Sequence, residues 1–326
     1  MPQIEIYREE WPIRGTFTIS RGSRTKSEVF VVELSDGAYL GRGECVPYAR
    51  YGESLESVQK QIEAQSEAII SGLSRDDLQD ALPAGAARNA IDCAMWDIEA
   101  KRAGKPVWEL AGLPAPKPLT SAFTLSLDTP ESMKQAAREN ASRPLLKLKL
   151  AGPDDLSRVE AVRSGAPDAA IIVDANEGWT GEIYTDLAPK LAALGVEMIE
   201  QPLPAGEDAV LAEMVRPVPV CADEACHDRA SLPGLVGRYD MINIKLDKTG
   251  GLTEALALKR EAEAMNFKVM VGCMLSTSLS MAPALLAAQG VSVVDLDGPL
   301  LLAQDRDHGL LFDGSVVHPA EAALWG

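Results

Sequence analysis

The feature that most constrains the fold is a repeat of short apolar runs, each of which ends in a polar residue or glycine and is followed by a loop and helical sequence. Eight such runs follow residue 117: SAFTLS, LLKLKL, AAIIVDAN, VEMIEQP, VPVCADE, MINIKLD, KVMVGCM and SVVDLDGP. From Lys149 onward, their terminal polar or glycine residues lie 22 to 27 residues apart. A spacing near two dozen residues is typical of a βα unit.

Eight βα units in succession predict an α/β fold of the (β/α)8-barrel type. Such a barrel typically occupies about 250 residues, whereas about 190 residues are available here, so we expect short loops. An open, doubly wound parallel sheet is the alternative. That fold carries a glycine-rich phosphate-binding turn after its first strand, and no such turn follows the first apolar run here.

The first 116 residues have a different pattern, of strands followed by helices. The segment EVFVVELSDGAYLGRGE alternates apolar and polar residues on both sides of Asp36-Gly37, a dipeptide that favours a hairpin turn. Helical sequence follows over about residues 54–73 and 84–103, and the second stretch ends at Gly104 with a proline just beyond it, as helix C-termini often do. We therefore expect an α+β domain before the barrel.

Composition excludes several classes of protein. The 326 residues are 46% hydrophobic and 24% charged, as in soluble globular proteins, and the net charge of −17 disfavours nucleic acid or an anionic membrane as a partner. The five cysteines form no CxxC pair and the three histidines have no zinc-ligand spacing, which indicates reduced thiols. The N-terminus, MPQIEIYREEWPI, has no signal-peptide pattern, and no apolar run reaches membrane-spanning length. We expect a cytoplasmic protein.

The run LLKLKL places two lysines on one face of a strand. Successive side chains of a strand point to opposite sides, so Leu146, Leu148 and Leu150 share one face. Lys147 and Lys149 share the other face. Taken alone, this pattern is typical of an amphipathic strand with one side in water. In a barrel it has a second interpretation, because catalytic groups sit at the C-terminal ends of the strands.

Carboxylates end the next three runs, at Asp174, Glu200 and Asp223. On neighbouring strands they would repel one another without a cation among them, and oxygen ligands without cysteine or histidine suit a hard ion. Mg²⁺ usually takes few protein carboxylates and keeps coordination positions for water and substrate. Any one of these acids could instead be a loop residue or a helix N-cap. Their occurrence on three consecutive strands favours a site for one Mg²⁺ ion.

Lysines flank these carboxylates on both sides. Lys149 ends the run before them and Lys245 ends the run after them, which places the two lysines across the barrel mouth from each other. A lysine accepts a proton only when it is neutral, and a neighbouring cation such as Lys147 lowers its pKa. Two bases on opposite faces of one carbon, with a metal ion to hold a developing oxyanion, can remove a proton beside a carboxylate and return it from the other side.

The segments KLKL, VDAN, IEQP, ADE and NIKLDKTGG together resemble the enolase superfamily, in the branch that contains muconate-lactonizing enzymes, o-succinylbenzoate synthases and dipeptide epimerases. The segment ARNAIDCAMWDIEAKRAGKPV resembles a helix of the capping domain in that superfamily. The resemblance implies a modified TIM barrel, (β/α)7β, over residues 117–304. It also implies an α+β capping domain formed by residues 1–116 and completed by residues 305–326.

The resemblance assigns roles to the residues at the strand ends. It implies that Asp174, Glu200 and Asp223 hold Mg²⁺ and that Lys149 and Lys245 are the paired acid/base lysines. This constellation does not fix the reaction, because the same two lysines can racemise, cycloisomerise or eliminate. The features that discriminate between these reactions must lie in the eighth strand and in the cap.

The eighth run, VVDLDGP, places Asp295 and Asp297 on one face of a strand, with Val294 and Leu296 turned away. Two carboxylates that the metal does not need suit a cationic group such as a substrate ammonium. Alternatively, Asp297 caps the turn at Gly298. This DxD resembles the motif with which dipeptide epimerases bind the free α-ammonium of their substrates.

Two stretches of the cap, RGSRTKSE and PYARYGES, resemble those of the dipeptide epimerases that act on L-Ala-L-Glu. Within the first, Arg24 is a candidate to bind the glutamate γ-carboxylate, since a fork of donors matches a carboxylate; the alternative is a solvated loop arginine. The resemblance thus implies an isomerase of murein peptides that inverts the Cα of the C-terminal residue through an enediolate. An o-succinylbenzoate synthase or muconate cycloisomerase reaction on the same scaffold is the alternative.

Two other classes of protein fit the sequence less well. A Schiff-base aldolase also presents a lysine at a strand end, but it has no need of three carboxylates in series. A binding protein without catalysis would tolerate the loss of either lysine, whereas this sequence keeps both. The breadth of the dipeptide pocket is not fixed by the sequence, and a homo-oligomer stays open, because barrels of this kind commonly assemble.

Overall fold

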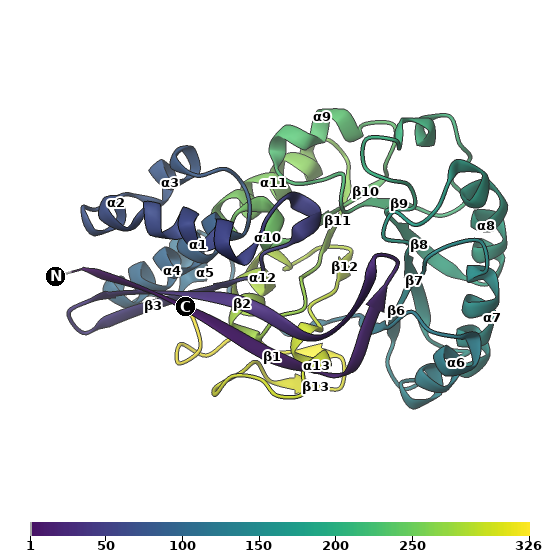
Figure 1. The fold of residues 1–326 in the computed structure, drawn as a ribbon, viewed down its shortest axis with the longest axis horizontal. Coiled ribbons are helices and arrows are strands. Elements are labelled where there is room, and N and C mark those ends of the chain that lie inside the picture. Colours follow the sequence, from purple (N-terminus) through teal and green to yellow (C-terminus); the bar gives the residue numbers. More distant parts are fainter. Residues whose placement is uncertain (1) are drawn as a thin grey trace.

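The computed structural model describes residues 2–326, which form a barrel and a cap (Figure 1). The barrel strands are β5 (Phe123–Leu125), β6 (Leu145–Lys149), β7 (Ala170–Asp174), β8 (Val196–Glu200), β9 (Val220–Ala222), β10 (Met241–Ile244), β11 (Lys268–Val271) and β12 (Val293–Val294). They form one parallel, eight-stranded sheet in chain order. The backbone N–H of Ala122, just before β5, donates to Val294 O (2.8 Å) and closes the ring. The predicted barrel is confirmed.

Helices connect most of the barrel strands on the outside. The longer ones are α6 (Pro130–Glu139), α7 (Asp155–Gly165), α8 (Gly181–Ala193), α11 (Leu252–Ala264) and α12 (Ser278–Ala287). The side chains of Thr129, Thr180 and Thr277 cap three of them, because each threonine oxygen accepts a hydrogen bond from a backbone N–H of the first turn. The connections from β8 to β9 and from β9 to β10 contain only the short elements η2 (Ala209–Ala212), η3 (Arg229–Ser231) and α9 (Leu232–Leu235). The short helix α10 (Leu246–Thr249) precedes α11, and α13 (Gly298–Leu301) follows β12.

The alternation of side chains along the strands builds two cores. Leu146, Leu148 and Leu150 point outward, as predicted, and are fully buried in the large cluster between the strands and the helices. Inside the ring, a separate cluster of apolar side chains fills the lower part of the barrel: Ala122, Ile172, Met198, Cys221, Met241 and Met270. Because that layer is filled, the inward-facing polar residues nearer the C-terminal ends of the strands can line only the mouth.

The cap combines an antiparallel sheet of β1 (Gln3–Ile19), β2 (Gly22–Asp36) and β3 (Tyr39–Cys45) with helices. The predicted turn at Asp36-Gly37 joins β2 to β3, and Gly37 has a φ of +64° that favours glycine. The helical elements are η1 (Ala49–Tyr51), α1 (Leu55–Ala64), α2 (Ser66–Ile70), α3 (Arg75–Ala81), α4 (Ala86–Ala103) and α5 (Val107–Leu110). The helix expected over residues 54–73 is thus divided into α1 and α2, whereas α4 ends at Gly104 as predicted.

The cap reaches the barrel mouth through the long hairpin of β1 and β2, drawn in purple in Figure 1. At its tip, Ser20 Oγ donates to Asn176 O in the loop after β7 (2.8 Å), and Leu127 N, just after β5, donates to Thr18 O (3.0 Å). The body of the cap packs closely, because α4 lies against Gly41 and Gly43 of β3 with no room for a Cβ atom. The hairpin tip therefore covers the ends of β5 and β7.

The C-terminal residues contact both parts of the molecule. Strands β13 (Phe312–Asp313) and β14 (Val316–Val317) form a small sheet with β4 (Leu119–Thr120), and Trp325 Nε1 donates to Cys93 O of α4 (3.0 Å). The domain boundaries proposed at residues 116 and 304 stay predictions. Among the helices of residues 2–326, none has both the length and the apolar character needed to span a membrane.

Candidate active site

The polar residues that end consecutive apolar runs meet at the barrel mouth. Lys149, Asp174 and Glu200 are the last residues of β6, β7 and β8, while Asp223 and Lys245 directly follow β9 and β10. All five side chains are buried, with at most 8% of any residue exposed. The structure therefore brings together the acids and the lysines that the sequence singled out.

The three carboxylates form a compact cluster of oxygen ligands. Asp174, Glu200 and Asp223 each offer one oxygen within 4.8 Å of the others. Asn243 Nδ2 donates to Glu200 Oε1 (2.7 Å), and Glu200 Oε2 lies 2.6 Å from Lys147 Nζ. Burial and the charge of Asp174 raise the pKa of Glu200. Three buried carboxylates, each with one oxygen in the same cluster, form a set of hard donors that fits a hard divalent cation such as Mg²⁺.

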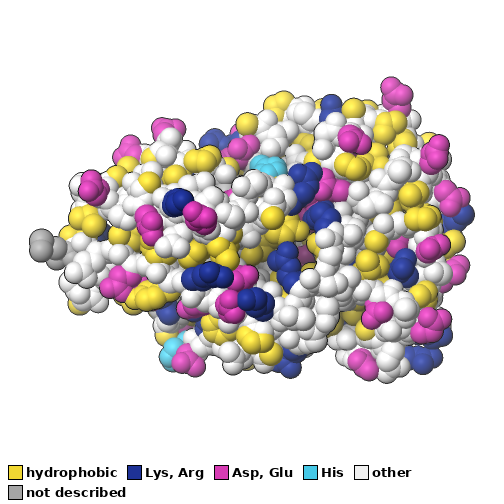
Figure 2. Space-filling model, viewed as in Figure 1, with side chains coloured by type: hydrophobic (Ala, Val, Ile, Leu, Met, Phe, Trp, Pro, Cys, Tyr) yellow, Lys and Arg dark blue, Asp and Glu magenta, His cyan; other side chains and the backbone are white. Residues whose placement is uncertain are grey.

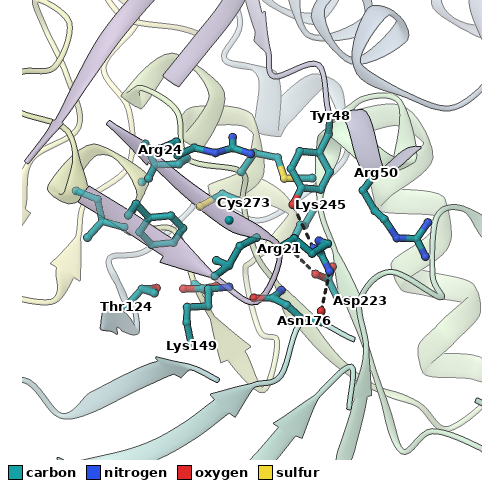
Figure 3. A pocket seen from close by; sticks show the side chains of 18 of the residues that line it. Arg21, Arg24, Tyr48, Arg50, Thr124, Lys149, Asn176, Asp223, Lys245 and Cys273 are labelled. Atoms are coloured by element: carbon teal, nitrogen blue, oxygen red, sulfur yellow. Dashed lines mark hydrogen bonds and ion pairs between the residues drawn. The ribbon is translucent and has the colours of Figure 1, made fainter. Parts of the chain in front are cut away.

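Lys149 and Lys245 lie on opposite sides of the ring, because β6 and β10 are four strands apart in a closed sheet of eight. Lys149 Nζ donates to Asp174 Oδ2 and Lys245 Nζ donates to Asp223 Oδ2, both at 2.6 Å. Figure 3 shows Lys149, Lys245 and Asp223 at the cavity. Burial alone would lower the pKa of Lys245, but the negative charges of Asp223 and Glu200 outweigh it and raise the pKa. With only protein charges around it, Lys245 therefore keeps its proton.

Lys147 lies at the centre of the charge network rather than in water. Its Nζ is 2.6 Å from Glu200 Oε2 and 2.7 Å from Asp295 Oδ2, and the residue is 1% exposed. Burial would lower its pKa, but the carboxylates of Asp295, Glu200 and Asp174 raise the pKa well above the ordinary value. Lys147 is thus a fixed positive charge beside Lys149, and its expected effect on the pKa of Lys149 stays a prediction.

Two further side chains fix Asp223, and the sequence reasoning did not identify them. Lys248 Nζ donates to Asp223 Oδ1 (2.7 Å) and is fully buried. Gln201 Oε1 accepts from the backbone N–H of Asp223 (2.9 Å), and Tyr239 OH accepts from Gln201 Nε2 (2.8 Å). Despite its burial, Lys245 and Lys248 hold the pKa of Asp223 well below its usual range. The only signals in the sequence are the amide after Glu200 and the lysine in DKTGG.

Asp295 and Asp297 reach the mouth by a different route from the one predicted. Strand β12 ends at Val294, so the two aspartates do not share the face of a strand; instead, Asp297 stands at the N-cap position of α13. Its side chain does not cap that helix, because Asp297 Oδ2 accepts from Thr124 N (2.6 Å). Burial and the charge of Asp295 raise the pKa of Asp297 to about 7. Both aspartates are nevertheless buried and line the cavity.

A cavity of about 460 Å³ lies between the cap and the barrel mouth. Its lining includes Lys149, Lys245 and Asp297 from the barrel, and Arg24 from the start of β2. In Figure 2, dark blue lysine or arginine side chains border a hollow in the middle of this face. The Arg24 guanidinium lies over the ring of Tyr48, 5.6 Å from its centroid, and forms no ion pair within residues 2–326. It is therefore free to meet an anionic group in the cavity.

Comparison with known families matches nearly the whole chain. Residues 1–112 match the mandelate racemase / muconate lactonizing enzyme N-terminal domain. Residues 131–317 match the enolase C-terminal domain-like family. The two matches correspond to the cap and to most of the barrel.

Curated relatives cover the chain from end to end. It is 48% identical over 320 residues to the L-Ala-D/L-Glu epimerase of Escherichia coli (strain K12), which covers 98% of this chain and 100% of the relative. It is 46% identical over 302 residues to the N-acetyl-D-glutamate racemase of a Pseudoalteromonas species, with coverage of 91% and 95%. Both relatives are named as isomerases of a glutamate derivative.

Solved structures share the same architecture. An enolase family member from Agrobacterium tumefaciens with homology to dipeptide epimerases, solved with sodium and L-Ala-L-Glu, is 53% identical over 100% of both chains, with a TM-score of 0.98. The dipeptide epimerase of Enterococcus faecalis V583, solved with Mg and L-Leu-L-Tyr, is 28% identical, with a TM-score of 0.89 and coverage of 98% and 97%. Dipeptides and metal ions thus occupy structures of this fold.

Proposed function

Because the chain belongs to the enolase superfamily, in its mandelate racemase/muconate lactonizing enzyme group, we propose that it is a Mg²⁺-dependent L-Ala-D/L-Glu epimerase. The observation that carries this function is the placement of Lys149 and Lys245 on opposite sides of one cavity, above a buried cluster of three carboxylates. Such an arrangement serves removal of a proton from one face of a carbon and its return to the other face.

The reaction is a 1,1-proton transfer at the Cα of the C-terminal residue. One of Lys149 and Lys245 removes the proton, and the other protonates the resulting enediolate from the opposite face. A Mg²⁺ ion held by Asp174, Glu200 and Asp223 would supply positive charge that offsets the charge developing on the substrate carboxylate and weakens the hold of the carboxylates on the lysine protons. One turnover exchanges the protonation states of the two lysines, and a turnover in the opposite direction restores them.

The groups that would bind the two ends of the dipeptide come from the barrel and from the cap. Asp297 forms no ion pair within residues 2–326, while Asp295 is matched by Lys147. A substrate ammonium between the two aspartates would supply the missing positive charge. Arg24 would bind the γ-carboxylate of glutamate with its fork of donors. Lys147 would keep the net charge around the substrate carboxylate low.

Three other reactions act on substrates that lack a free ammonium group. N-acetylglutamate lacks the ammonium and would leave the pair of buried aspartates with excess negative charge. The substrates of o-succinylbenzoate synthase and muconate cycloisomerase lack it as well, and the relatives and neighbours reported above do not favour those reactions. Asp295 and Asp297 therefore favour a dipeptide.

Proton NMR in D₂O with Mg²⁺ tests the function. We expect L-Ala-L-Glu to lose the signal of the glutamate Cα proton and to yield the L-Ala-D-Glu diastereomer, with a panel of L-Ala-L-Xaa dipeptides ranking the side chains. N-acetyl-L-glutamate serves as the matched substrate without an ammonium. Absence of exchange on every dipeptide would refute the assignment, and faster exchange on N-acetylglutamate would replace it with an N-acylglutamate racemase.

The setting of the reaction is also a proposal. L-Ala-D-Glu is a unit of murein peptides, as the family resemblance implies, so we propose a role in their turnover in the cytoplasm. The partner is a small dipeptide, and neither nucleic acid nor membrane is needed. A homo-oligomer stays a prediction.

A further inference from the structure

Three arginines of the cap line the cavity, and two of them are bound to carboxylates of the barrel loops. Arg21 Nη2 donates to Glu224 Oε1 (2.6 Å), and Arg21 Nη1 donates to Glu177 Oε2 (3.1 Å). Arg50 donates to Glu177 through Nε and Nη2, at 2.7 and 2.6 Å. Arg24 is the third arginine and has no carboxylate partner within residues 2–326. The charges of two arginines are thus neutralised, while that of Arg24 is left for a ligand.

Glu177 joins several loops at the edge of the cavity without lining it. Its carboxylate binds Arg21 of the β1–β2 hairpin, Arg50 of η1, and the backbone N–H of Ala205 in the loop after β8 (2.8 Å). The side chain is 8% exposed, and Glu177 has a φ of +67°, in the left-handed region that non-glycine residues rarely adopt. The loop that carries it directly follows Asp174, the last residue of β7. Glu177 therefore ties both cap loops to a loop that starts at the carboxylate cluster.

Tyr48 lies between Arg24 and the ion pair of Arg21 with Glu177. Arg21 Nη2 donates to Tyr48 OH (3.1 Å), and the guanidinium carbons of Arg21 and Arg24 lie 6.0 and 5.6 Å from the centroid of the Tyr48 ring. Figure 3 shows Arg24 and Arg21 beside this ring, with Arg50 on the outer side. A cation within about 6 Å of an aromatic ring is attracted to its face. Arg24 thus packs against a tyrosine whose hydroxyl binds Arg21, and Arg21 in turn binds Glu177.

We propose that Glu177, acting through Arg21 and Tyr48, is a positioning residue that holds Arg24 over the cavity and so sets the preference for an acidic C-terminal side chain. The inference rests on the proposed function and deepens it. Glu177 touches neither the cavity nor the reacting atoms, so its effect must appear in the choice between substrates rather than in proton transfer. Without the contacts of Glu177, the hairpin tip and Arg24 would adopt many orientations. The orientation of Arg24 that binds the substrate side chain would then be less populated.

The selectivity ratio tests this directly. It is kcat/KM for L-Ala-L-Glu divided by kcat/KM for L-Ala-L-Gln, two dipeptides that differ only in the charge of the side chain. In Glu177→Gln we expect the ratio to fall at least fivefold, mainly through a higher KM for L-Ala-L-Glu, with kcat changed much less. A ratio equal to that of the wild type, or an equal fall in kcat/KM for both dipeptides, would overturn the proposal.

Two further variants separate positioning from general damage. Asp36→Asn is the matched control, because it breaks an exposed ion pair of the cap with Arg102 (2.7 Å) that lies away from the cavity, and it should leave the ratio unchanged. In an Arg24→Gln background, Glu177→Gln should change the ratio no further, since both act through the same guanidinium. Additive losses would overturn the proposal. If Glu177→Gln does not fold, Tyr48→Phe decides: an unchanged ratio would refute the link through Tyr48 OH.

Limited trypsin digestion tests, without any substrate, whether Glu177 holds the tip of the β1–β2 hairpin in place. Arg21 and Arg24 are cleavage sites in the hairpin tip, and the contacts of Arg21 with Glu177, Glu224 and Asn176 should protect the bond after Arg21. We expect cleavage after Arg21 to be at least fivefold faster in Glu177→Gln than in the wild type and in Asp36→Asn. Equal cleavage would overturn the proposal. If the wild type epimerises neither dipeptide, the proposed function fails, and this digestion still decides whether Glu177 holds the hairpin.

Discussion

Replacement of Asp297 by asparagine tests two effects of this buried carboxylate separately: the loss of folding stability that it causes and its role in binding the substrate ammonium. Burial and the charge of Asp295 raise the pKa of Asp297 to about 7, compared with about 3.9 for an unperturbed aspartate. Because the pKa of Asp297 is higher in the folded state than in the unfolded state, Asp297 contributes stability that is fully present below about pH 4. This contribution is lost as the pH rises through about 7. The difference of about 3 pKa units corresponds to about 4 kcal/mol at pH 8. Asp297→Asn should therefore be more stable than the wild type at pH 8, by up to that amount.

Activity should change in the opposite direction. Removal of one partner of a buried ion pair costs about 2–5 kcal/mol, which lowers kcat/KM for L-Ala-L-Glu by about 30- to 5000-fold. In the wild type, kcat/KM should rise as the pH increases through about 7, because the ammonium binds the ionised form of Asp297, and should fall above about 8 as the substrate amine loses its proton. The limb near pH 7 should vanish in Asp297→Asn.

The assays are urea unfolding at pH 5 and pH 8, and epimerisation rates at subsaturating dipeptide between pH 5.5 and 9. Asn replaces one carboxylate oxygen by NH₂ and keeps an oxygen that can accept from Thr124 N, so the local fold should persist. Lower stability of Asp297→Asn at pH 8 would refute the cost assigned to the buried charge. An unchanged acid limb in the variant would refute the role of Asp297 in binding the ammonium.

Two other predictions concern the metal site and the cap. Mg²⁺ at 100 times its Kd should stabilise the wild type by about 2.7 kcal/mol, seen as a higher Tm. Glu200→Gln should lose most of this gain because it replaces one of the three carboxylates by a neutral amide, and an equal gain in the variant would contradict the site. Gly43→Ala should destabilise the protein by about 2–3 kcal/mol, because a Cβ there collides with Ala90 O of α4; a change below about 0.5 kcal/mol in urea unfolding would show that the cap can yield at this contact.

The barrel and the residues at its strand ends were predictable from the sequence for a physical reason. Each buried parallel strand needs a run of apolar residues, and each run ends where the chain leaves the sheet, so Lys149, Asp174 and Glu200 mark the ends of β6, β7 and β8. Parallel strands with helical crossovers place these ends on one side. The opposite orientations of the Leu148 and Lys149 side chains follow from the two-residue period of a strand.

The local geometry beyond the strand ends was not predictable in the same way. The alternation that placed Asp295 and Asp297 on one strand face assumed that β12 continues, whereas it ends at Val294 because the chain turns into α13. The lysine in DKTGG is a weak signal because lysines are usually exposed, and only the folded structure shows that Lys248 is buried against Asp223.

The contacts between the cap and the barrel were hidden for another reason. Arg21 and Glu177 are 156 positions apart in the chain, and no period or turn signal relates them. Their meeting depends on how far the β1–β2 hairpin reaches across the barrel mouth, which tertiary packing sets. The sequence offered Arg24 in the same stretch, but only the structure distinguishes the arginine without a carboxylate partner from its neighbour.

Exchange of the Cα proton by the two lysine variants tests the central claim most directly. Lys149→Ala and Lys245→Ala should each be folded and unable to epimerise. In D₂O with Mg²⁺, each variant should still exchange the glutamate Cα proton of one diastereomer, L-Ala-L-Glu or L-Ala-D-Glu, and the two variants should differ in which one they exchange. This complementary pattern is what two bases on opposite faces predict. Exchange of the same diastereomer by both variants, or epimerisation by either, would contradict the account.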